Sequence, residues 1–126
     1  FTLDPAHLIQ KLNLHFTCAE DRDAAIASLA GEDVNIVCCE KHSIEITHAS
    51  VTKGTGLLAL AAQLGIPAEE TIAVGDADND LPMLRAAGLG VAMGNANENA
   101  RAASDVTVAD NDHDGCAEAI RRFLLG

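Results

Sequence analysis

The stretch TIAVGDADNDLPML, residues 71–84, places three carboxylates directly after an apolar run. Residues 71–74 have the continuous apolar pattern of a short buried strand, and Asp76, Asp78 and Asp80 follow it on alternate positions. Like charges this close together are costly unless a cation or hydrogen-bond donors balance them. A calcium loop, a helix cap and a magnesium-dependent phosphoryl-transfer site would each give such a pattern.

Helices and strands are predicted to alternate around this stretch. Apolar periodicity predicts helices over residues 52–65, 80–88, 97–103 and 114–125, and strands over residues 71–74, 89–93 and 105–109. This alternation is typical of an α/β fold with a doubly wound, Rossmann-like parallel sheet. Ligands bind such sheets beyond the carboxyl ends of the strands, which is where Asp76 falls.

The predicted helices should each bury one face. In the helix over residues 52–65 the expected inward stripe is Leu57, Leu60, Ala61 and Leu64. In the last helix it is Cys116, Ile120 and Phe123. Small side chains in and beside the third helix should allow close packing, namely Ala96, Ala100 and Ala103.

Residues 1–48 have a different pattern. Strands are predicted over residues 11–18, 34–39 and 43–48, and a helix over residues 21–31, which gives a β-α-β-β order with a terminal hairpin. In the first strand, alternation predicts a buried face made of Leu12, Leu14, Phe16 and Cys18. We therefore expect two parts, residues 1–48 and residues 49–126.

Composition and charge narrow the class of partner. The formal net charge of −11 argues against nucleic acid or an anionic membrane, because both need a basic surface. The negative charge does not exclude small phosphorylated metabolites, because proteins usually bind their phosphate groups through local hydrogen-bond donors and a metal ion. The four cysteines form no CxxC pair, and no signal peptide or membrane span is present. We expect buried, reduced cysteines and a cytoplasmic protein.

Calcium loops of the EF-hand type fail at both acidic clusters. Such a loop needs glycine at position 6 and a bidentate carboxylate at position 12. In a loop counted from Asp76, neither position holds the required residue. Counted from Asp110, Gly115 fits, but Arg121 stands where the carboxylate belongs. Whether Asp110 and Asp112 contribute to a site is left open.

Helix capping explains some of these carboxylates. Asp114 is best interpreted as a cap of the last helix, and Asp80 could cap the helix that follows it. Asp76 has no such explanation, because it would lie at the mouth of a parallel sheet beside other carboxylates. Mg²⁺ is the natural candidate there, since it prefers hard oxygens and takes only one or two protein carboxylates.

Lys53 lies at the start of a predicted helix, where the helix dipole favours an anion and not a cation. It is either a solvated surface lysine or the cation of a phosphate site. The order of residues around it is wrong for a P-loop, which needs GxxxxGK followed by Ser or Thr.

Residues 45–126 resemble the C-terminal half of a haloacid dehalogenase-like phosphatase, of the Cof-like type with a large inserted cap that includes sugar-phosphate phosphatases. The motifs that carry the resemblance follow in order: Lys53, GDADND at 75–80, GVAMGNA at 90–96 and NDHDG at 111–115.

The resemblance implies a role for most residues of the first cluster. Lys53 would hold the phosphoryl group and the carboxylate of the nucleophile, and Asp76 would bind Mg²⁺. Asp80 would support Lys53 or the metal-bound waters, and Asn79 would contact the substrate phosphate. Asp78 falls at a variable position of the motif and receives no role.

The nucleophile of the family, the first aspartate of a DxDGT motif, is not found. The nearest match, Asp21 and Asp23, is followed by two alanines and begins a predicted helix. We expect residues 1–48 to be the C-terminal part of a cap domain and residues 49–126 the C-terminal half of a hydrolase core. This chain alone should be inactive, and its exposed half-core should favour self-association or association with a missing N-terminal portion.

The predicted function of the intact protein is magnesium-dependent hydrolysis of a phosphomonoester, a sugar phosphate or similar small metabolite, through a phosphoaspartate. One alternative is a non-catalytic cation- or phosphate-binding remnant. Others are a phosphomutase-like or a disaccharide-phosphate phosphatase member of the same superfamily.

Overall fold

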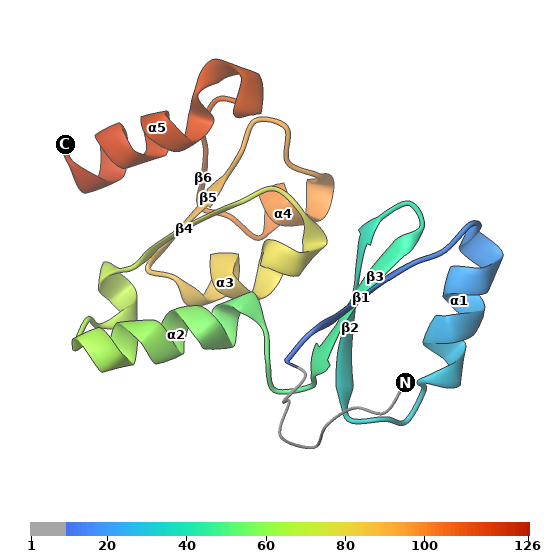
Figure 1. Ribbon diagram of the computed structural model, residues 1–126. Coiled ribbons are helices and arrows are strands. Elements are labelled where there is room, and N and C mark those ends of the chain that lie inside the picture. Colours follow the sequence, from blue (N-terminus) through green and yellow to red (C-terminus); the bar gives the residue numbers. More distant parts are fainter. Residues whose placement is uncertain (1–9) are drawn as a thin grey trace. The chain divides into compact units, whose positions relative to one another are not determined.

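The structure, a computed structural model, describes residues 10–126 except for the side chain of Cys39, and the chain divides into two units (Figure 1). The first unit ends at Val51 and the second runs from Thr52 to Gly126. This division falls three residues after the boundary expected from the sequence. Over the described residues, no helix combines the length and apolar character that crossing a membrane requires.

The first unit has the predicted β-α-β-β order. Its elements are β1 (Leu12–His15), α1 (Ala19–Ser28), β2 (Val34–Glu40) and β3 (Ser43–His48). The three strands form an antiparallel sheet in the order β1-β3-β2, so β3 is central. The last two strands form the expected hairpin, and its register shifts between Cys38 and Glu40.

The two faces of this sheet differ in polarity, as the alternation predicts. Ile46 pairs with Leu12 on one side and with Ile36 on the other, which makes one apolar face. On the opposite face, Lys11 and Glu45 form an ion pair at 2.9 Å.

The predicted burial of β1 is wrong. Leu12 is 45% and Leu14 38% exposed, whereas Ile44 on the neighbouring strand is fully buried. The reason is position: β1 lies at an edge of the three-stranded sheet, and β3 lies at its centre.

The second unit contains the predicted parallel sheet, in the order β4-β5-β6. Its main elements are α2 (Lys53–Leu64), β4 (Ile72–Gly75), α3 (Leu81–Ala86), β5 (Leu89–Ala92), α4 (Glu98–Ala102), β6 (Val106–Thr107) and α5 (Gly115–Ala119). Short helical turns complete it: η1 (Ala68–Glu70), η2 (Asp78–Asp80), η3 (Asn111–His113) and the π-helical η4 (Ile120–Leu124).

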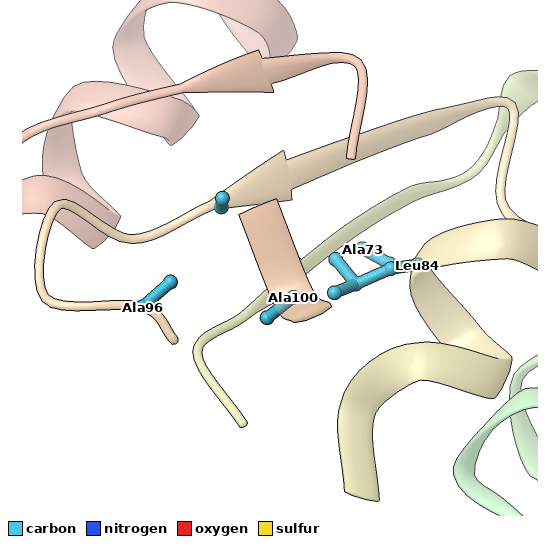
Figure 2. Close-up of a cluster of buried hydrophobic side chains, with 5 residues drawn as sticks. Ala73, Leu84, Ala96 and Ala100 are labelled. Carbon is cyan, nitrogen blue, oxygen red and sulfur yellow. The ribbon is translucent and has the colours of Figure 1, made fainter. Parts of the chain in front are cut away.

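Helices cover both faces of this sheet, as in a doubly wound fold (Figure 1). On one face Ala73, Leu84, Ala92, Ala96 and Ala100 form a buried cluster, and Figure 2 shows Ala73, Leu84 and Ala100 close together. On the other face Val91, Met93 and Val108 pack with Ala119 of α5. The alanines around α4 pack closely, as predicted.

Several predicted inward residues lie in solvent. On α2, Ala61 is buried and Leu57 packs against the core, but Leu60 is 56% and Leu64 64% exposed. At the end of the chain, Ile120 is 48% exposed, and Cys116 and Cys38 are exposed free thiols. A sheet of three strands covers only part of each helix, so apolar periodicity overstates burial here.

Gly54 allows α2 to approach α3. A Cβ atom on Gly54 would lie 2.5 Å from the carbonyl oxygen of Pro82, whereas a Cβ on Gly56 would meet nothing within 4 Å. Both glycines belong to α2, so they form a matched pair.

We predict that Gly54→Ala lowers the free energy of unfolding by about 1–3 kcal/mol, because the added methyl group overpacks the contact with α3. Gly56→Ala should raise it by about 0.5–1 kcal/mol through helix propensity. Urea denaturation of both variants gives the two values. Equal effects in the two variants would contradict the close approach of α2 and α3.

Candidate functional site

The candidate site lies where β4 ends at Gly75 and the chain continues into η2. A Cβ atom on Gly75 would lie 2.5 Å from the Cβ of Asp80, so only glycine leaves room for the Asp80 side chain. Asp80 is 4% exposed. A carboxylate is therefore packed against the carboxyl end of a parallel strand, which is the usual ligand-binding edge of such sheets.

Asp80 links three parts of the second unit. Its Oδ1 is paired with the Nζ of Lys53, and its Oδ2 accepts hydrogen bonds from the backbone N–H groups of Asp76 at 2.9 Å and Ala77 at 3.2 Å. It makes no capping hydrogen bond to α3, so the alternative interpretation of Asp80 as the cap of that helix is wrong. Its carboxylate turns back to the end of β4 instead.

These contacts keep Asp80 ionised. Burial by itself would raise the pKa of the carboxyl, but the hydrogen bonds from Lys53 and from the N–H groups of Asp76 and Ala77 outweigh it and hold the pKa below its usual range. The ionised form is thus the one that the fold stabilises.

Lys53 is the first residue of α2, and its side chain is 48% exposed. Its helix start is held by a capping box, in which the Thr52 hydroxyl accepts from the Thr55 N–H and the Thr55 hydroxyl accepts from the Thr52 N–H. An ammonium group has three donors. The Lys53 ammonium is therefore fixed by Asp80 on one side and open to an anion on the other.

Asp76 is exposed and is held by two asparagines of the β5–α4 segment. Its Oδ2 accepts from the Nδ2 of Asn95 at 3.0 Å, and its carbonyl oxygen accepts from the backbone N–H of Asn97 at 3.0 Å. Reasoning from the sequence missed both residues. The signal was present, because Asn95 follows the next parallel strand and so reaches the same edge of the sheet.

Asp78 has structural contacts that the sequence did not predict. Its Oδ1 accepts from the side-chain amides of Asn97 and Asn99, each at 3.0 Å. Asn97 also caps α4, because its Oδ1 accepts from the Ala100 N–H at 2.8 Å. Asp78 therefore ties η2 to the start of α4. The neighbouring Asn79 is half-buried in η2, between Asp78 and Asp80.

The second acidic cluster is a capped turn. Asp110 accepts from the Asp112 N–H at 3.1 Å and lies 2.6 Å from the Nδ1 of His113, which lowers the pKa of Asp110. Asp114 adopts the left-handed conformation with φ of 57° and makes no capping bond, so the predicted cap of the last helix is wrong. The Gly115 N–H instead donates to the carbonyl oxygen of Asp110 at 3.0 Å.

The residues present fit part of a magnesium site. Over the described residues, no group of three or more His, Cys, Asp or Glu side chains is placed to hold a metal ion. Asp76 offers one exposed, hard carboxylate, and Mg²⁺ typically takes only one or two of these together with waters and substrate phosphate. The second unit could thus supply one protein ligand, and the remaining protein ligands would have to come from elsewhere.

Comparison with known proteins identifies the family. The haloacid dehalogenase-like hydrolase family matches residues 6–120, and the chain belongs to it. Phosphatase YwpJ of Bacillus subtilis is 45% identical over 93 residues, which are 74% of this chain and 33% of that protein. The chain thus spans about a third of the length of this relative.

Solved structures of the same family share the fold. A haloacid dehalogenase-like hydrolase from B. subtilis is 38% identical with a TM-score of 0.83, over 91% of this chain and 41% of that one. A sugar phosphatase of subclass IIB is 30% identical with a TM-score of 0.80, over 94% of this chain and 44% of that one. The resemblance to the capped, Cof-like phosphatases is thereby confirmed.

We predict that the Asp80 contacts make stability depend on acid pH. The folded pKa is lowered, so the unfolded chain binds a proton first as pH falls below about 3.9, the usual value for aspartate. The stabilisation is therefore present above that pH and is lost as pH falls toward the folded pKa. Asp80→Asn should be about 1–3 kcal/mol less stable at pH 7, and the difference should shrink in acid.

Urea denaturation between pH 2.5 and 7 measures this dependence. Asp78→Asn is the matched control, because it removes a charge from the same cluster without touching Lys53. It should keep the acid slope of the unchanged chain. If the stability of Asp80→Asn depends on acid pH as strongly as that of the unchanged chain, the assignment of this pH dependence to Asp80 is contradicted.

Proposed function

We propose that the complete protein is a magnesium-dependent phosphomonoester hydrolase that acts on a sugar phosphate or a similar small phosphorylated metabolite. The observation that carries the proposal is the link through Asp80, which holds a half-exposed lysine and the backbone of Asp76 at one edge of a parallel sheet. Family membership and the phosphatases among the similar proteins support it.

Each residue has a distinct part in this proposal. Lys53 binds the oxygens of the phosphoryl group and stabilises the charge that develops on them during transfer. Asp80 orients the Lys53 ammonium through their ion pair. Asp76 would hold Mg²⁺, which supplies further charge stabilisation to the phosphoryl oxygens. Asn79 contacts the substrate phosphate.

The nucleophile in this proposal lies outside this chain. Asp21 and Asp23, the nearest match to the family motif, both belong to α1 of the first unit. Asp23 is paired with the neighbouring Arg22 at 2.7 Å, and Asp21 lies 3.5 Å from the hydroxyl of Thr17. These are contacts of an ordinary helix start. The phosphoaspartate would therefore form on an aspartate in the part of the protein that precedes these residues.

The first unit is proposed to be the C-terminal part of a cap domain. Its sheet has a hollow of about 150 Å³, which is lined by polar side chains together with one isoleucine: Asn13, His15, Glu40, Ser43, Ile44 and Glu45. Such a hollow offers donors and acceptors for the hydroxyl groups of a sugar. It would contribute to substrate choice and not to the chemical step.

We predict that the 126-residue chain alone does not hydrolyse p-nitrophenyl phosphate with Mg²⁺, because it lacks the nucleophile. A phosphate-release assay at high enzyme concentration measures this. Robust magnesium-dependent turnover by the purified chain would contradict the proposal that the nucleophile lies outside this chain.

A second test uses the protein that the complete reading frame encodes, which would contain the nucleophile. In that protein, Asp76→Asn should reduce activity by at least about 100-fold, as expected for the loss of a metal ligand. Asp78→Asn keeps an oxygen for Asn97 and Asn99 and should retain most activity. A reading frame that starts near Phe1, with no upstream DxDGT motif, would favour a non-catalytic cation- or phosphate-binding remnant instead.

The open edge of the second unit gives a place for the rest of the core. In the described sheet β4 pairs only with β5, and an apolar groove of about 210 Å³ lies beside it. The groove is lined by Glu70, Ile72, Val74, Ala119, Ile120 and Leu124. We propose that preceding polypeptide covers this edge in the complete protein, and that copies of the isolated chain associate through it.

Sedimentation velocity should therefore show concentration-dependent self-association of the isolated chain. Leu124→Asp places a charge in the groove and should shift the equilibrium to monomer. Leu125→Asp is the matched control, because Leu125 is similarly exposed but does not line the groove. A chain that stays monomeric at high concentration would contradict the proposed association.

A further inference from the structure

Asp76 is held by the segment just beyond β5 at both its main chain and its side chain. The Asn97 N–H donates to the Asp76 carbonyl oxygen, and the Asn95 amide donates to the Asp76 Oδ2, both at 3.0 Å. Over the described residues, the other carboxylate oxygen, Oδ1, accepts no hydrogen bond. The carboxylate thus has one engaged and one open oxygen.

The orientation of the Asn95 amide follows from its two partners. Its Oδ1 accepts from the backbone N–H of Asn111 at 3.1 Å, and a backbone N–H can only donate. The NH2 group must therefore face the carboxylate, which can only accept when ionised. A flipped amide would lose both hydrogen bonds, so the network determines one orientation.

The partner of Asn95 is itself anchored. Asn111 begins η3, a turn capped by Asp110 through the Asp112 N–H. The residue before that cap, Ala109, accepts from the Gly94 N–H at 3.1 Å, which joins this turn to the residue preceding Asn95. The chain from β5 and the chain after β6 thus support Asn95 from both sides.

We propose that Asn95 is a positioning residue that presents Asp76 to a metal ion through a single oxygen and thereby favours Mg²⁺ over Ca²⁺. The inference rests on the proposed metal-binding role of Asp76. Mg²⁺ requires near-ideal octahedral geometry, which suits one oxygen from each carboxylate, whereas Ca²⁺ accepts bidentate carboxylates and a higher ligand number. An amide bound to Oδ2 disfavours the bidentate mode.

Asn99 provides a matched control. Its side-chain amide donates to a carboxylate oxygen of Asp78 at 3.0 Å, the same kind of bond at the same length, on the neighbouring acidic residue. Asn99→Ala therefore removes one amide–carboxylate contact from the cluster and leaves the partners of Asp76 in place. Asn95→Ala removes the contact that the inference invokes.

NMR titration of the ¹⁵N-labelled complete protein, which also holds the metal ligands proposed to lie outside this chain, tests the inference without any enzymatic activity. Mg²⁺ and Ca²⁺ are added separately at constant ionic strength, and apparent dissociation constants are obtained from the backbone amide shifts of Asp76 and Ala77. Asn95→Ala should weaken Mg²⁺ binding by about tenfold, as expected for a lost outer-shell hydrogen bond, and Ca²⁺ binding by clearly less. Asn99→Ala should leave the ratio of the two constants unchanged.

Each outcome decides between the claims. An unchanged ratio in Asn95→Ala, with Mg²⁺ still perturbing Asp76, would overturn the role of Asn95 and leave the proposed function intact. No response of Asp76 to either ion in the unchanged complete protein would overturn both claims about the metal. Asn95→Ser is measured in parallel, because it also lacks the amide but keeps a polar side chain in the loop. It should show the same shift in the ratio.

Discussion

The buried carboxylate of Asp80 is the constraint on which the second unit depends. A carboxylate removed from water is costly unless it is paired and fully hydrogen-bonded. Here the Lys53 ammonium and two backbone N–H groups meet that need, and the three donors come from the start of α2 and the turn after β4. The same requirement explains Gly75, because any side chain there would displace Asp80.

The acidic cluster around Asp80 is balanced mainly by neutral groups. Asp76 and Asp78 accept hydrogen bonds from asparagine amides, which orient their carboxylates without cancelling the charge. Lys53 is paired with Asp80 and is open to solvent on its other side. The edge of the sheet thus combines an oriented negative cluster, suited to a cation, with one ammonium group suited to an anion. In the proposed function this combination would serve a phosphoryl group and its metal ion.

Local patterns in the sequence predicted the elements and their order. Gly65 ends α2 in the left-handed conformation, and the strands at 71–74 and 89–93 pair in parallel, because turn chemistry and periodicity are encoded over a few residues. Burial was harder to predict. Leu60, Leu64 and Ile120 fit an amphipathic stripe, but their exposure depends on how much sheet lies beneath them.

The site was predicted in part for a similar reason. Asp76 and Lys53 were selected as candidates because their positions at a strand end and a helix start are unusual, and Asp80 received its expected role from the family resemblance. The ion pair between Lys53 and Asp80 joins residues that are 27 positions apart, so it could not be derived from their spacing in the sequence. Asn95, Asn97 and Asn99 lie 19 to 21 residues from the carboxylates that they bind. Asp114 was assigned as a cap from its place before a helix, but its left-handed backbone excludes that geometry.

The ionisation of Asp80 tests the central claim most directly, because the pairing of Lys53 with the end of β4 depends on it. A ¹³C NMR titration of the Asp80 carboxyl carbon measures its pKa in the folded chain. We predict a pKa below about 3.9, the usual value for aspartate, and a rise in that pKa in Lys53→Met. A pKa at or above the usual value, unchanged by Lys53→Met, would contradict the central claim.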